Sequence, residues 1–156
     1  MYTYNLNELK QAAIRMRDQL ERGEQNIGAN MLETAGDVIV LQSHRIQHEG
    51  RNSAGEVMRT KSPRSLDAYS RAYALLRQKR GRQTDLVDFT LEGDLFRNYN
   101  ILQATAKEVI VGFMDLGMAE IAGYLEAYFG GAWYLSSSER KMIGTLMTEK
   151  TLRDLR

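Results

Sequence analysis

Two histidines one helical turn apart are the residues of this sequence best spaced for metal chemistry. His44 and His48 stand in the segment HRIQH, and an i, i+4 pair on one helix face can share a zinc ion. A zinc protease would have a glutamate directly after the first histidine as its general base, and the chain has no third histidine to complete a site. We therefore expect two solvent-facing histidines near a helix end and no bound metal. The alternative, a metal-dependent hydrolase, would require stoichiometric zinc in the purified protein.

Residues 50–57, GRNSAGEV, have the G-x-x-x-x-G spacing of a phosphate-binding loop. Glu56 and Val57 stand where that loop requires Lys and Ser/Thr, and a carboxylate there would repel phosphate. The three serines at 136–138 are not part of a G-x-S-x-G elbow, so we interpret them as helix-capping residues.

Asp88, Glu92 and Asp94 lie close together in the sequence, and two such carboxylates could act as a general acid and a general base. They alternate with apolar residues, which is what the solvent-facing side of a strand requires. The sequence therefore predicts no enzyme activity, no catalytic residue and no cofactor.

The length and composition are those of one ordinary globular domain. The chain has 156 residues, of which 43% are apolar and 26% charged, enough to form a single core. We expect one domain over residues 1–156, with an exposed basic loop at about 49–64. No cysteine is present, so the sequence excludes disulfides and thiolate sites. Since no run is long enough to span a membrane and no signal segment is visible, we expect a soluble protein, intracellular where it is made, with no membrane partner.

Charge is distributed unevenly along the chain. Lys/Arg and Asp/Glu number five and seven in residues 1–50, nine and two in residues 51–82, and seven and eleven in residues 83–156. The net charges are therefore −2, +7 and −4, and the middle block suits contact with nucleic acid or an acidic protein face. A solvated loop and helix surface explains the block equally well. The candidate interaction surface consists of Arg51, Arg59, Lys61, Arg64, Arg77, Lys79, Arg80 and Arg82.

Period-two alternation is confined to residues 86–113. Val87, Phe89 and Leu91 alternate with polar residues, which predicts a strand over 86–92 with one face on a core. Residues 108–113, EVIVGF, predict a second, β-branched strand. The predicted fold class is α+β: a small antiparallel sheet covered by a long N-terminal helix and three further helices.

Apolar residues at three- and four-residue steps predict the helices. A proline at the first helical position after Ser62 indicates the start of the second helix, and Gly81 its end. Asp115 suits the N-cap of the third helix, and Ser136 with Glu139 forms a capping box for the fourth. The predicted helices cover about 7–48, as one long bent helix, then 63–78, 115–128 and 136–152.

The order of these segments resembles the tail-completion (virion morphogenesis, or neck) proteins of tailed bacteriophages, over about residues 10–150. In that family a loop with Asp-Gly precedes a helix with a tyrosine and a closing lysine, similar to Gly55, Tyr69 or Tyr73, and Lys79 here. Leu91–Leu95 is similar to the family's Thr-Gly-x-Leu. The segments EVIVGF, AEIAGYLEAYFGG and WYLSSSERKMI look like its later strand and its last two helices.

The chain departs from the family at Glu92, where the family has threonine, and it lacks both a histidine before Gly130 and a Pro-Arg before Trp133. The subfamily therefore has two interpretations: a neck or tail-completion subunit, or a tail terminator. The resemblance implies a non-enzymatic structural subunit of the virion, at the head–tail junction or in the tail, present in the host cytoplasm during assembly. It implies a homo-oligomeric ring, for instance a hexamer, with phage head-completion and tail-tube proteins as neighbours and non-specific contact with DNA in the lumen.

The alternative function is a small basic nucleic-acid-binding module that uses the same block of positive charge. Such a module would bind nucleic acid as an isolated monomer, with an affinity that falls as salt rises.

Overall fold

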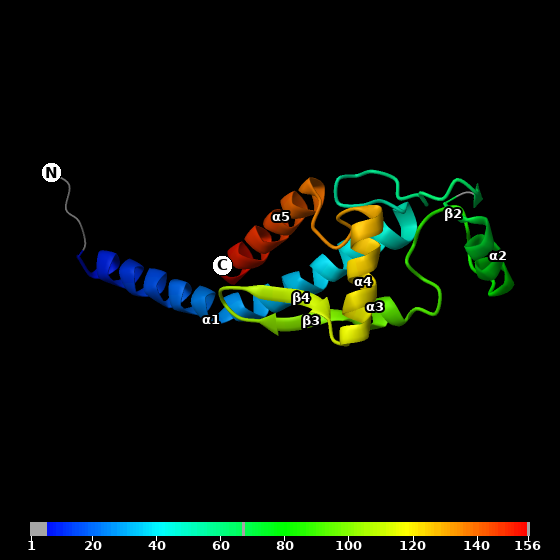
Figure 1. Ribbon diagram of the computed structural model, residues 1–156. Coiled ribbons are helices and arrows are strands. Elements are labelled where there is room, and N and C mark those ends of the chain that lie inside the picture. The colour runs from blue at the N-terminus through cyan, green and yellow to red at the C-terminus, as the bar shows by residue number, and fades with distance from the viewer. Residues whose placement is uncertain (1–5, 67, 156) are drawn as a thin grey trace.

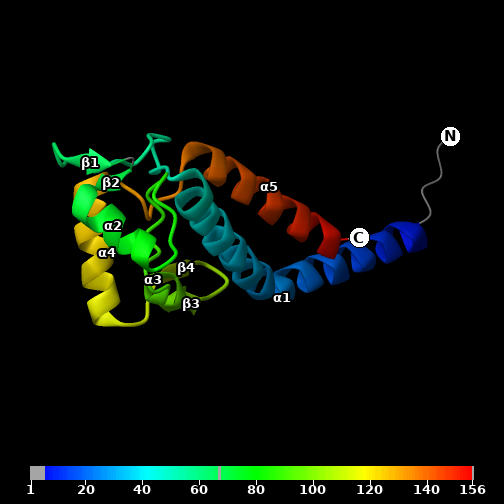
Figure 2. The ribbon, with the colours of Figure 1, turned by 90° about the vertical axis from the view of Figure 1, so that its right-hand side faces the viewer.

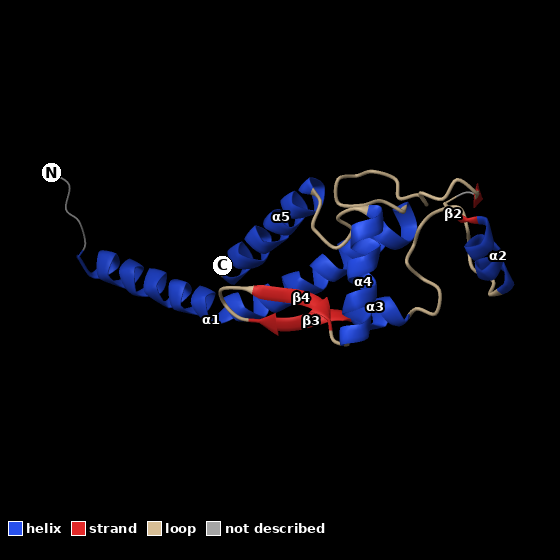
Figure 3. Ribbon diagram, in the orientation of Figure 1, coloured by secondary structure: helices blue, strands red, loops and turns tan. Residues whose placement is uncertain are grey.

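The computed structural model describes residues 6–66 and 68–155, and its elements are mostly helical with two small sheets (Figures 1 and 3). In chain order they are α1 (Leu6–His44), the π-helical turn η1 (Arg45–Glu49), β1 (Ser65–Leu66), β2 (Tyr69–Ser70), α2 (Arg71–Lys79), α3 (Asp94–Asn98), β3 (Tyr99–Ala104), β4 (Val109–Phe113), α4 (Leu116–Phe129) and α5 (Ser137–Asp154). The predicted α+β class is confirmed. Among the described helices, none has the length and apolar content that crossing a bilayer requires.

The long N-terminal helix is confirmed, and it bends along its length as predicted (Figure 2). Its C-terminal half lies against α5 and the β3–β4 hairpin, whereas residues 7–22 extend beyond them. The end of α5 defines the boundary, because a Cβ built on Gly23 would lie 2.9 Å from Leu155 Cδ2. Glycine at this position lets the C-terminal leucine pack directly on the helix backbone.

The main sheet is an antiparallel pair of β3 and β4, so the strand predicted at 108–113 is confirmed and the strand predicted at 86–92 is wrong. Asp88 explains the error. Its Oδ1 accepts a hydrogen bond from the backbone N–H of Thr90 at 2.8 Å, which closes an Asx turn instead of a strand. Phe89 follows with φ of +53°, in the left-handed region. Asp88 is buried and does not lie on a solvent-facing strand surface.

The second helix begins later than Ser62–Pro63 indicates. Ser65–Leu66 and Tyr69–Ser70 form the short β1–β2 pair, and α2 starts after Ser70. The predicted end is confirmed, since Gly81 adopts φ of +66° just beyond the helix. The N-caps predicted for the last two helices are also confirmed, with Asp115 accepting from Met118 N–H and Ser136 forming a reciprocal capping box with Glu139.

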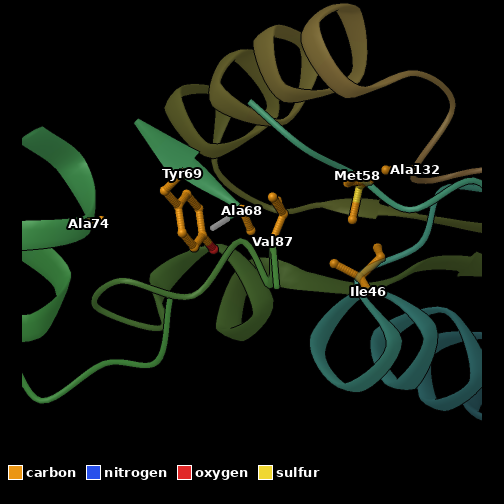
Figure 4. Packing of buried hydrophobic residues seen from close by; sticks show 7 residues of the cluster. All are labelled: Ile46, Met58, Ala68, Tyr69, Ala74, Val87 and Ala132. Atoms are coloured by element: carbon orange, nitrogen blue, oxygen red, sulfur yellow. The ribbon is translucent and has the colours of Figure 1, made fainter. Parts of the chain in front are cut away.

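The core lies where η1, Met58 of the basic loop, β2, α2 and the 86–89 turn meet (Figure 4). Met58 and Ile46 face one another there, and Val87 lies beside Tyr69 and Ala68. Trp133 extends the core with rings from the 86–89 turn, α3, β3 and β4. Their ring centroids lie 4.9–5.7 Å from that of Trp133 and belong to Phe89, Phe96, Tyr99 and Phe113.

Candidate interaction surface

Arg77 is not part of an exposed surface, which corrects the prediction for this residue. Its side chain is 1% exposed, and Nη2 donates to both carboxylate oxygens of Asp88 at 2.9 and 2.8 Å. Nε donates to Gln83 O at 2.8 Å, and Nη1 donates to Thr90 O at 3.0 Å. A planar guanidinium suits this role because its fork can satisfy one carboxylate and two carbonyls at once. Arg77 therefore holds α2 to the 83–90 segment.

Tyr69 completes the buried network around Asp88. Its hydroxyl donates to Asp88 Oδ1 at 3.1 Å and accepts from the Asp88 backbone N–H at 3.0 Å. The Arg77 guanidinium lies 4.4 Å from the centroid of the Tyr69 ring, and burial raises the pKa of the Tyr69 hydroxyl. The neutral phenol is therefore a permanent hydrogen-bond donor within this network.

The other seven predicted residues are exposed: Arg51, Arg59, Lys61, Arg64, Lys79, Arg80 and Arg82. Two of them are attached to the segment after the Asx turn, because Arg80 forms an ion pair with Glu92 and Arg82 Nε donates to Leu91 O at 2.9 Å. The structure therefore divides the predicted surface into these seven exposed cations, which we call the basic rim, and a buried arginine.

The basic loop, residues 50–64, is fastened to the body at several points. Arg51 and Val57 form an isolated antiparallel bridge, and Asn52 Oδ1 accepts from the backbone N–H of Ala54 and of Glu56. Ser53 N–H donates to Gly131 O at 2.8 Å. These bonds leave its arginine side chains in solvent while the backbone is held.

Tyr128 connects α4 to the basic loop. Its hydroxyl lies 3.1 Å from Thr60 Oγ1 and accepts from Lys61 N–H at 2.7 Å. These two hydrogen bonds, that with Thr60 first, lower the pKa of the Tyr128 hydroxyl. The Lys61 ammonium lies 5.2 Å from the centroid of the same ring. Of the rim residues, Lys61 therefore lies against α4.

An apolar groove of about 600 Å³ lies beside this contact, between α4, α2 and the 87–95 segment. We call it the α4 groove, and its main lining residues are Tyr73, Leu91, Met118, Ile121, Tyr124 and Leu125. No motif indicated this groove, because it is lined by three segments far apart in the sequence. A second groove of similar size, about 640 Å³, lies between α1, the β3–β4 hairpin and α5.

Both histidines are exposed, His44 as the last residue of α1 and His48 in η1, and their ring centroids are 5.0 Å apart. His44 Nδ1 is 3.4 Å from a carboxylate oxygen of Glu49. Within residues 6–66 and 68–155, no three His, Asp or Glu side chains are grouped to hold a metal ion.

Arg45 is a second buried hub, which no motif in the sequence indicated. Its guanidinium donates to Glu139 Oε1 at 2.8 Å and to the carbonyl oxygens of Arg51, Ala132 and Tyr134, each at 2.9 Å. Burial alone would raise the pKa of the Glu139 carboxyl, but hydrogen bonds from Arg45 and Ser136 outweigh it and the pKa lies below its usual range. The sequence feature that could have indicated this hub is an arginine within the apolar stripe of the long helix.

Tyr99 lies near this hub, at the start of β3. Its hydroxyl donates to Gln42 Oε1, and burial raises the pKa of Tyr99 to about 12. Gln42 in turn donates from Nε2 to Trp133 O at 2.7 Å. These bonds fix α1 against the sheet and the 130–136 segment.

Comparison of the chain with protein-family models, curated proteins and solved structures gives no match.

Proposed function

We propose that the chain is a non-enzymatic structural subunit of a tailed-bacteriophage virion, working as a ring at the head–tail junction as a neck, tail-completion or tail-terminator protein. The order of segments that resembles this family supports the proposal. In the structure these segments are the long α1, the basic loop, α2, β4 and the capped α4 and α5. The proposed neighbours are copies of the same chain, together with head-completion and tail-tube proteins.

The observation that carries the proposal is the open β3–β4 sheet. Within the described chain no third strand pairs with either β3 or β4, so each presents one unpaired edge. Apolar side chains accompany these edges, with Leu102 50% and Ile110 43% exposed. Open edges and exposed apolar side chains are typical of a subunit whose fold is completed by its neighbours.

The basic rim supplies the second part of the proposed role. In the described chain, six of its seven cationic side chains form no ion pair, and only Arg80 is paired, with Glu92. We propose that this rim meets an acidic neighbour or the DNA that passes through the ring.

Genetic complementation tests the proposed function. In a phage that encodes the chain, interruption of its gene is expected to leave separate heads and tails, and the wild-type gene supplied in trans should restore virion yield. A triple variant, Lys79→Gln/Arg80→Gln/Arg82→Gln, removes exposed rim charges and leaves Arg77 intact, so the protein should fold while virion yield falls at least tenfold. Normal virions from the interrupted phage would contradict the function, and normal yield from the triple variant would contradict the role of the rim.

A nucleic-acid-binding module is the second candidate, since the same exposed cations would serve it. A gel-shift assay of the purified chain at about 50 and 200 mM salt separates the two. Binding that weakens steeply with salt would favour this candidate, and absence of binding at the lower salt would remove it.

A further inference from the structure

The first turns of α1 carry an apolar stripe that nothing in the described chain covers. We call residues 7–22 the N-terminal extension, and all of them except Gln19 are exposed. The stripe consists of Leu9, Ala13, Met16 and Leu20, and Met16 is 65% exposed.

This stripe is the continuation of a face that is already used for packing. Leu20 and Val38 are separated by about five full helical turns, as are Ala13 and Met31, so each pair lies on the same side of α1 at 3.6 residues per turn. Met31 and Val38 line the groove between α1, the hairpin and α5, and Thr34 Oγ1 on the same face lies 3.5 Å from Met147 Sδ of α5. Where α5 ends against Gly23, the same face continues into solvent.

The α4 groove lies at the other end of the molecule. Figures 1 and 2 both place α4 far from the N-terminal extension, with the body of the protein between them. A chain therefore cannot place its own extension in its own groove, and any extension docked there must come from another copy.

The chemistry of the two surfaces is complementary. The groove presents a helical ridge of Ile121, Tyr124 and Tyr128, with Tyr124 75% exposed, so its apolar side chains suit an apolar helix face. On α4 the exposed Glu120 directly precedes Ile121 of the groove lining, whereas the Glu126 carboxylate accepts hydrogen bonds from the backbone of residues 132–133. Along one edge of the stripe the extension carries Lys10 and Arg17, two helical turns apart. Arg17 also forms exposed ion pairs with Asp18 and Glu21 of its own helix, at 3.3 and 3.5 Å. An apolar contact flanked by opposite charges is thus available between two copies.

We propose that the N-terminal extension of one copy docks in the α4 groove of the next, so that the chain assembles head to tail. Such a heterologous contact closes into a ring if the rotation between copies fits, and otherwise continues as an open filament. This contact rests on the proposed function, in which copies of the same chain form a ring, and it names the two surfaces that would join neighbouring copies.

Mixing two variants of the full-length chain tests the contact. Met16→Glu disables the extension and Tyr124→Glu disables the groove, and both positions are exposed, so each variant should fold. By sedimentation velocity the wild type is expected to form oligomers and each variant to remain at the 17.8 kDa of the monomer. An equimolar mixture should give a dimer with one copy of each variant and nothing larger, because only one intact extension and one intact groove can meet.

Matched controls introduce the same charge elsewhere on the same two helices. Gln11→Glu lies opposite the stripe, and Ala127→Glu lies on α4 outside the residues that line the groove. Both variants should assemble as the wild type does. Circular dichroism of all four variants confirms that a change in mass is not a loss of fold.

Several results would overturn the inference. A wild-type chain that stays monomeric at every concentration would contradict it. Oligomers of wild-type size formed by Met16→Glu or by Tyr124→Glu would also contradict it, and would assign assembly to the sheet edges or to the second groove. A dimer of Tyr124→Glu alone would indicate pairing of two extensions. None of these outcomes bears on whether the protein lies at the head–tail junction, which imaging of particles decides separately.

Discussion

At the scale of single residues, the buried ion pair of Arg77 and Asp88 decides the local structure. Asp88 is an exposed strand residue by its pattern, but it becomes the acceptor for Arg77, Gln83, Tyr69 and the backbone of Thr90. A carboxylate with this many donors outweighs the preference of its apolar neighbours for an extended strand. The pairing joins residues eleven positions apart, so no local pattern predicted it.

Substitution of Arg77 by methionine is expected to destabilise the fold by about 3–5 kcal/mol, because it leaves the Asp88 carboxylate buried without its partner. The control is Arg80→Met, which breaks an exposed ion pair and should change the free energy of unfolding by roughly 0.5 kcal/mol or less. Urea unfolding followed by circular dichroism measures both. Equal midpoints for the two variants would contradict the structural role of Arg77.

Glu139 is expected to contribute to acid denaturation. Its folded-state pKa lies below the ordinary value of 4.5, so the carboxylate stabilises the fold fully above about pH 5 and loses this contribution as pH falls through the folded-state pKa. Between pH 5 and 3 the free energy of unfolding should therefore fall less steeply in Glu139→Gln than in the wild type. Parallel pH profiles for the two proteins would show that Glu139 is not part of the acid transition.

At the scale of elements, sequence prediction succeeded where the determinants are local. Helix α1 follows from its continuous apolar spacing, and the starts of α4 and α5 follow from caps that bond within the first turn. Strand β3 was not predicted from the sequence. Its register shifts between Ile101 and Gln103, which breaks the period-two pattern that would have indicated a strand. The predicted start of α2 was wrong because Ser65–Leu66 and Tyr69–Ser70 pair as β1 and β2 before the helix begins.

The cap of α5 offers a test at this scale. Ser136→Ala removes the acceptor for Glu139 N–H and should lower the free energy of unfolding by about 0.5–2 kcal/mol. The control is Ser137→Ala, an exposed position inside the helix, which should leave stability almost unchanged. If both alanine variants unfolded at the same denaturant concentration, the capping box would carry no net stability.

At the scale of the whole molecule, the sequence predicted a basic surface but not the apolar groove beside it. The excess of positive charge in residues 51–82 can be counted directly in the sequence, and charged side chains are usually exposed. Seven of the eight predicted cations are exposed in the structure. The α4 groove depends on the packing of α2, α4 and the 87–95 segment, which only the tertiary structure brings together. The exposed stripe of the extension also looked like ordinary core spacing until the end of α5 became known.

The central claim is that this chain is a ring subunit at the junction of a phage head and tail. The most direct measurement is electron microscopy of intact particles labelled with a gold-conjugated antibody against the chain. The account predicts label at the head–tail junction, or at the head-proximal end of the tail for a terminator. Particles that carry no label, or label spread over the capsid shell, would contradict it.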